Sequence, residues 1–111
     1  MSGTDTKKAV VSGADADGLG EALEDEGVEV TRVEGVATGE SLDAAGIDDA
    51  DLFVVTDADD ATAVSIAKDR NPDVKVVFYA HDSLPEFAKG QADLAVDPDL
   101  LAADVVAEEL V

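Results

Sequence analysis

Acidic side chains follow two of the predicted strands and could do chemistry together. Asp15 and Asp17 stand in the turn after an apolar run at residues 8–12, and Asp57 follows a second run at 51–56. The carboxyl ends of parallel strands meet at one edge of a sheet, where ligands bind. Carboxylate oxygens are the ligands that Mg²⁺ prefers. One hypothesis is therefore an Mg²⁺-dependent phosphatase that uses these three aspartates.

Residues that such a phosphatase needs are missing here, and so is one that a response-regulator receiver needs. In phosphatases of the haloacid-dehalogenase type the nucleophilic aspartate ends its strand, whereas Asp15 lies three residues beyond Ser12, and no lysine follows a matching strand. A response-regulator receiver would need a lysine after the fifth strand, and this chain has Asp97 there. In a sequence so rich in aspartate, chance pairs are common, so the phosphatase remains only a third alternative.

His81 is the only histidine, and it follows the fourth apolar run. A histidine that acts as a base needs a group to orient it. The sequence offers only the adjacent Asp82, so we predict a plain loop role for His81. Nothing resembles a nucleophile elbow, and we predict no catalytic residues and no enzymatic activity.

Short apolar runs alternate with helix-like runs along the whole chain, which is typical of βαβ units and a parallel sheet. We therefore predict the α/β class, as one Rossmann-like, three-layer α/β/α domain over residues 1–111 with a disordered tail at 1–6. The simplest strand order is 2-1-3-4-5, and its switch point lies between strands 1 and 3. The expected strands are 8–12, 28–33, 51–56, 74–79 and 93–96, and the expected helices are 18–26, 40–45, 59–70, 83–90 and 98–111.

The last predicted helix begins with Asp97 as N-cap and Pro98 at the first helical position. Its apolar residues recur at helical spacing, so we expect them to face the core, with some left to form a dimer contact. They are Leu100, Leu101, Val105, Val106 and Leu110.

The 111 residues carry a formal net charge of −20, and 46% of them are hydrophobic. Such a charge destabilises the compact state at low salt, and in about 1 M salt the Debye length falls to about 3 Å. The acids are spread along the chain, so we interpret the charge as adaptation to high salt. Clustered basic residues for nucleic-acid contacts are missing. Because no bilayer-spanning run or apolar leader is present, we expect a cytoplasmic protein.

The chain from Leu42 onward resembles the TrkA-N or RCK domain of potassium-transport regulators. Residues 42–51 (LDAAGIDDAD) resemble that family's helix-to-strand signature, and residues 54–60 (VVTDADD) resemble its strand and acidic loop. Residues 71–74 (NPDV) and 91–96 (QADLAV) resemble its later links and last strand. Members of the family bind nicotinamide or adenine nucleotides and gate channels or transporters.

This resemblance implies a regulatory homodimer that contacts a transporter or channel and binds NAD(H) or an adenine nucleotide. The glycine motif has become G-x-D-x-x-G over residues 13–18, and a helix and a strand are missing after residue 33. The implied nucleotide site is thus degenerate, with binding weak or lost. Its cofactor-binding residues are Gly13, Asp15, Gly18, Glu34, Thr56 and Asp57. The alternative is a ligand-free Rossmann remnant that serves as a protein-interaction subunit.

Overall fold

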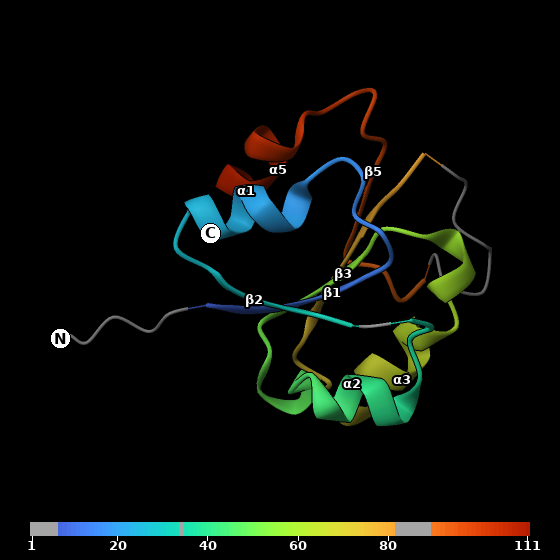
Figure 1. Cartoon of the computed structure of the whole chain (residues 1–111). Coiled ribbons are helices and arrows are strands. Elements are labelled where there is room, and N and C mark those ends of the chain that lie inside the picture. The colour runs from blue at the N-terminus through green and yellow to red at the C-terminus, as the bar shows by residue number, and fades with distance from the viewer. Residues whose placement is uncertain (1–6, 34, 82–89) are drawn as a thin grey trace, which may run out of the picture.

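The protein is a five-stranded parallel sheet between two layers of helices, as a computed structural model shows (Figure 1). The structure describes residues 7–33, 35–81 and 90–111. The strand order is β2-β1-β3-β4-β5, and every neighbouring pair is parallel, which confirms the predicted order. The strands are β1 (Lys8–Ser12), β2 (Glu29–Arg32), β3 (Leu52–Val55), β4 (Lys75–Tyr79) and β5 (Leu94–Val96).

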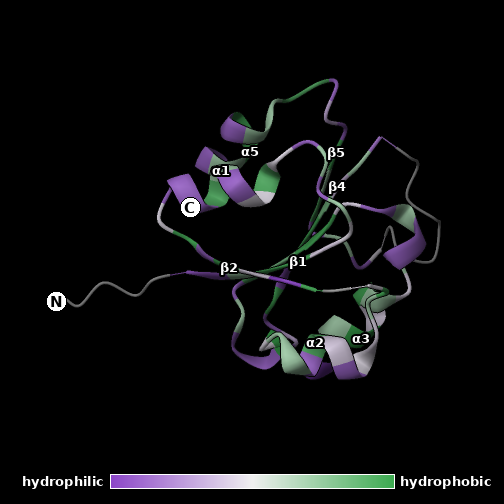
Figure 2. Cartoon of the chain, in the orientation of Figure 1, coloured by the Kyte–Doolittle hydropathy of each residue, from purple (hydrophilic) through white to green (hydrophobic). Residues whose placement is uncertain are grey.

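In the part of the chain that the structure describes, two α-helices lie on each face of the sheet. Helices α1 (Leu19–Asp25) and α5 (Ala103–Leu110) lie on one face, and α2 (Gly39–Ala44) and α3 (Ala63–Arg70) lie on the other (Figure 1). Because alternate strand residues point to opposite faces, Val10 and Phe53 pack with α2 and α3, whereas Val11 and Val54 pack with α1 and α5. The strands form the hydrophobic centre, and the outer sides of the helices are largely hydrophilic (Figure 2).

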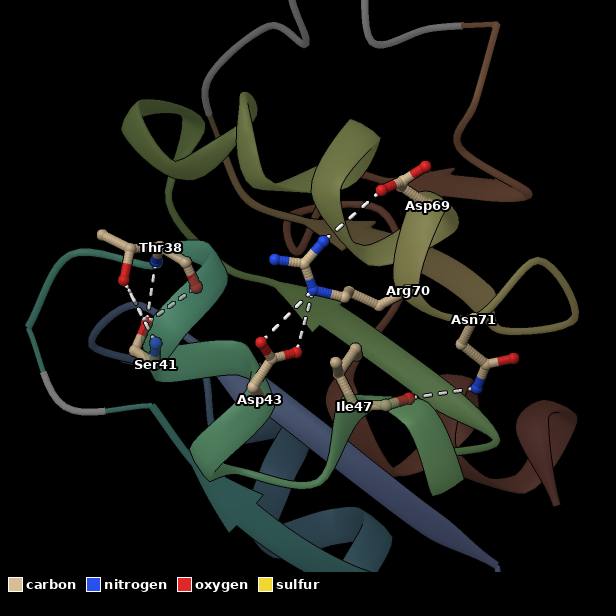
Figure 3. Close-up of polar contacts among 7 residues, drawn as sticks. All are labelled: Thr38, Ser41, Asp43, Ile47, Asp69, Arg70 and Asn71. Carbon is tan, nitrogen blue, oxygen red and sulfur yellow. Dashed lines mark hydrogen bonds and ion pairs between the residues drawn. The ribbon is translucent and has the colours of Figure 1, made fainter.

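Helix α2 begins and ends one residue earlier than the predicted helix at 40–45. The Thr38 and Ser41 side chains each accept a hydrogen bond from the other's backbone N–H, so they form a reciprocal cap (Figure 3). Gly46 follows the helix with φ at 83°, a conformation that favours glycine. Arg70 then ties α3 to Asp43 of α2 with an Nε–Oδ1 distance of 3.0 Å. These contacts fix the α2–α3 layer.

The helix predicted from Asp59 begins later, at Ala63. Residues Ala58–Asp60 form a 3₁₀ turn instead, and the Asp57 side chain caps this turn by accepting a hydrogen bond from the Asp59 N–H at 2.9 Å. A local side-chain acceptor thus competes successfully with the first turn of an α-helix.

The prediction that the last helix begins at Pro98 is wrong. The Asp97 side chain accepts from the Asp99 N–H at 2.8 Å, and its carbonyl accepts from the N–H groups of Leu100 and Leu101. These bonds close a turn, and α5 starts only at Ala103. Leu100, Leu101 and Val105 are consequently exposed and not in the core, whereas Val106 and Leu110 are buried as predicted.

The predicted tail at 1–6, Glu34 and most of the predicted helix 83–90 lie outside the described residues. Among the described helices, none has the length and apolar character needed to cross a membrane.

Candidate functional site at the carboxyl edge of the sheet

The residues that follow β1 and β3 meet at the switch point, as expected. The Thr56 hydroxyl donates to the Ser12 carbonyl at 2.7 Å and accepts from the Asp15 N–H at 3.1 Å. Gly13, at φ 92°, lies directly against Thr56 and Asp57, so a side chain at this position would collide with Thr56 Oγ1. Gly13, Asp15, Thr56 and Asp57 therefore form one compact corner of the molecule.

Within this corner, the Asp15 carboxylate points inward and caps α1. Its side chain is only 2% exposed, and its oxygens accept from the N–H groups of Leu19 at 3.0 Å and Gly20 at 2.8 Å. Arg32, at the end of β2, donates to Asp15 Oδ2 at 3.0 Å. We call Asp15, these two N–H groups and Arg32 the Asp15 turn. Its carboxylate occupies the helix N-terminus, the place where an anionic ligand would bind.

Asp15 holds this position with φ at 53°, in the left-handed region where aspartate is tolerated better than most residues. Gly18, which precedes the helix, also has positive φ, at 77°. A nucleotide pyrophosphate would have to displace the Asp15 carboxylate to reach the α1 N–H groups. Binding of NAD(H) or an adenine nucleotide by Gly13, Asp15, Gly18, Thr56 and Asp57 stays a prediction, and Glu34 lies outside the described residues.

The three aspartates proposed for Mg²⁺ do not form one site. Asp15 is held by Arg32, Asp57 caps its own turn, and Asp17 lies against His81. Among the described residues, the only group of three acidic or histidine side chains whose donor atoms lie within 4.8 Å of one another is His81, Asp97 and Asp99.

His81 is surrounded by carboxylates, so the expectation that it lacks an orienting partner is wrong. Its Nε2 lies 3.2 Å from Asp17 Oδ2. Its Nδ1 lies 3.4 Å from Asp99 Oδ2 and 3.8 Å from Asp97 Oδ1. We call His81, Asp17, Asp97 and Asp99 the His81 cluster. No local pattern could have revealed it, because Asp17 precedes His81 by 64 residues.

The carboxylates of the His81 cluster shift the pKa values of His81 and of the neighbouring Tyr79. The hydrogen bond to Asp17 raises the pKa of His81 above its usual value of 6.5, and the charge of Asp99 acts in the same direction. Burial raises the pKa of Tyr79, and the charge of Asp17 adds to this effect. The Tyr79 hydroxyl donates to the Leu101 carbonyl at 2.7 Å, which anchors the loop that carries Asp97 and Asp99.

Taken together, the fold and this edge define a class of protein, a doubly wound α/β domain whose switch point holds acidic residues. A model of a family of unknown function, DUF7126, matches residues 9–110, and the chain belongs to that family. No curated protein matches the sequence closely enough to count as a relative.

Solved structures with the same fold include several response regulators. HP1043, an orphan response regulator of H. pylori, is 17% identical with a TM-score of 0.72, over 94% of this chain and 92% of that chain. The regulator TrrA, solved with the histidine kinase ThkA, is 16% identical with a TM-score of 0.68, over 96% and 99%. A pilus assembly-related protein from Burkholderia pseudomallei is 17% identical with a TM-score of 0.68, over 95% of this chain and 87% of that chain.

These comparisons overturn the resemblance to the TrkA-N or RCK domain. The family that matches is a different one, and the similar structures are response regulators and pilus assembly proteins. The prediction of a nucleotide-sensing regulator of potassium transport was therefore wrong. The motifs after Leu42 lie in strands, at helix ends and in the turns that connect them. Many parallel α/β sheets contain such connections.

Proposed function

We propose that this chain is a receiver-like regulatory domain that transmits its signal by protein contact, without phosphorylation of an aspartate. The observation that carries this proposal is the Asp15 turn. The carboxylate that follows β1 is turned inward and already bound to Arg32, so it is not free to hold a metal ion beside Asp57. One of the similar structures, an atypical orphan response regulator, is described as having a phosphorylation-independent regulatory mechanism.

The charge balance at this edge supports the same proposal. A phosphoryl group on Asp57 would bring further negative charge, which metal ions and positioned cations normally stabilise. Asp97 follows β5 at this edge. Arg32, the one Lys or Arg paired with a carboxylate there among the described residues, already binds Asp15. An aspartyl phosphate at Asp57 would thus meet repulsion from the acidic side chains along this edge.

Exposed apolar side chains support a role in protein contact. Leu100 is 79% exposed, and Leu101 and Val105 are 43% and 41% exposed. These three residues lie in or beside α5, next to a shallow groove of about 250 Å³ lined by Leu94, Val96 and Leu101 among others. Clustered exposed apolar residues commonly mark interaction sites. The predicted homodimer would be the simplest contact of this kind.

Phosphorylation is tested by incubating the protein with acetyl phosphate and Mg²⁺ in molar KCl and measuring its intact mass. We expect no added phosphoryl group in the wild type. The matched control is Asp57→Asn. A phosphorylated wild type together with an unmodified Asp57→Asn variant would overturn the proposal.

Self-association through the exposed apolar residues is tested by sedimentation in molar KCl, in which the Leu100→Ser variant is compared with Val36→Ser. Val36 is 73% exposed but follows β2, away from α5, and so it controls for general loss of surface hydrophobicity. We expect Leu100→Ser alone to weaken self-association. If the wild type is a monomer at every concentration, the homodimer prediction is wrong.

A further inference from the structure

The His81 cluster joins three segments that are distant in the sequence. Asp17 comes from the loop between β1 and α1, His81 follows β4, and Asp97 and Asp99 follow β5. All of them lie at the carboxyl edge of the sheet. The side chains of His81 and Asp97 are about half exposed, at 51% and 44%. A metal ion from solvent can therefore reach their donor atoms.

Among the residues that the structure describes, the charges of this cluster do not balance. Even a protonated His81 supplies one positive charge against three carboxylates within 4 Å of its ring nitrogens. In the part of the chain that the structure describes, no lysine or arginine pairs with Asp17, Asp97 or Asp99. A divalent cation would neutralise this excess, which a proton on His81 cannot do alone.

The donor atoms also have the arrangement that a small transition metal ion requires. Ligands at 2.0–2.1 Å from a tetrahedral Zn²⁺ lie about 3.3 Å from one another. The distances from His81 Nδ1 to Asp99 Oδ2 and Asp97 Oδ1, 3.4 and 3.8 Å, are close to this separation. The hydrogen bond from the Asp99 N–H to Asp97 Oδ1, at 2.8 Å, already holds the two aspartates in one tight turn.

The other ring nitrogen of His81 has the partner that metal-binding histidines commonly have. Such histidines usually donate their second N–H to a carboxylate, which orients the ring and increases its basicity. Asp17 lies 3.2 Å from Nε2 and can accept that hydrogen bond. Asp17 is thus placed to position the ligand, while Asp97 and Asp99 face Nδ1.

We propose that His81 Nδ1 and the carboxylates of Asp97 and Asp99 bind a divalent transition metal ion of the Zn²⁺ and Co²⁺ class, with Asp17 orienting the ring of His81. Mixed imidazole and carboxylate ligands favour such ions over Mg²⁺ or Ca²⁺, which prefer oxygen alone. Three protein ligands leave one tetrahedral position to water. This site goes beyond the proposed signalling role and does not depend on it.

The experiment measures binding of Co²⁺ to the full chain in molar KCl, after treatment with a chelator and its removal. Co²⁺ reports its ligands through its visible absorption spectrum, and it broadens the proton resonances of the ring that binds it. His81 is the only histidine in the chain, so a single set of imidazole resonances is followed. We expect one bound Co²⁺ per chain, a tetrahedral spectrum, and a rise in melting temperature, because the ion binds the native state alone.

Variants separate this site from general attraction to an acidic surface. We expect His81→Gln and Asp99→Asn to abolish the tetrahedral spectrum, and Asp17→Asn to weaken binding about 10- to 100-fold. Asp57→Asn is the matched control, since it removes a carboxylate from the same edge outside the cluster. Asp99 is 78% exposed, so its variant is expected to fold even where another does not.

Two results would overturn the proposal. One is Co²⁺ binding to His81→Gln as tight as to the wild type. The other is a melting shift with Mg²⁺ that equals the shift with Co²⁺ and persists without His81, because both would indicate only a diffuse cloud of cations around an acidic surface.

Discussion

The Asp15 turn and the His81 cluster lie at the same edge of the sheet and use the same residue type in opposite ways. The Asp15 side chain is 2% exposed, and two backbone N–H groups and Arg32 satisfy its charge. The three aspartates of the His81 cluster are exposed and share one imidazole. The difference shows that aspartates after parallel strands can be buried and neutralised within the fold or left exposed with excess negative charge, and that their partners decide which.

The largest effect is expected from removal of the Asp15 side chain. Asp15→Ala leaves two N–H groups of α1 and one face of Arg32 without their acceptor, so we expect a loss of about 3 kcal/mol in the free energy of unfolding. Asp15→Asn keeps one acceptor oxygen and tolerates the positive φ, and it should lose less. Chemical denaturation in molar KCl measures both. An Asp15→Ala variant as stable as the wild type would mean that water replaces the carboxylate at no cost.

Tyr79→Phe should have a smaller effect and should act on the other region. It removes the hydrogen bond to the Leu101 carbonyl and keeps the ring in the core, so we expect a loss of about 1 kcal/mol. Because Leu101 ends the turn of Asp97 and Asp99, amide hydrogen exchange in residues 97–102 should also increase. Equal protection of this loop in both proteins would show that Tyr79 does not hold it.

Asp99→Asn should stabilise the protein at low salt, in contrast to every change at Asp15. With chelator present and at a pH above the raised pKa of His81, Asp99 faces only like charges nearby, so we expect a gain of about 0.5 kcal/mol. The gain should disappear in molar KCl, because the Debye length falls to about 3 Å. Thermal melts across a KCl series measure it. The wild type itself should lose stability as KCl is removed.

The smallest expected effect is a pH dependence of stability caused by His81, which belongs to the His81 cluster and not to the Asp15 turn. The hydrogen bond to Asp17 raises the pKa of His81 in the folded protein, and Asp99 adds to this, so protonation stabilises the native state. This contribution is fully present below the unfolded pKa of about 6.5 and disappears as the pH rises through the folded value. With chelator present, melting temperatures of the wild type and His81→Gln should therefore converge as the pH rises from 6 through the folded pKa of His81. A constant difference over this range would contradict the shift.

Local sequence patterns determined most of the fold. Continuous apolar runs such as residues 52–55 are typical of strands covered on both faces, and the run is buried at every position. The predicted helix at 40–45 corresponds to α2, which Thr38 caps and Gly46 follows. Together with the alternation of strands and helices, these signals led to the correct strand order. These signals are reliable because hydrogen bonds and burial within each segment stabilise the element that the signal indicates.

Only the tertiary structure decided which carboxylates are neutralised by a partner and which lie together around one histidine. Asp15 finds Arg32 across 17 residues, and His81 finds Asp17 across 64, because parallel pairing brings successive strand ends to one edge. The burial of the last apolar segment also depended on tertiary context. The turn at Asp97 delays α5 to Ala103, so Leu100 and Leu101 reach solvent while Val106 and Leu110 reach the core. Spacing in the sequence specifies a helical face, but loop geometry specifies where that face begins.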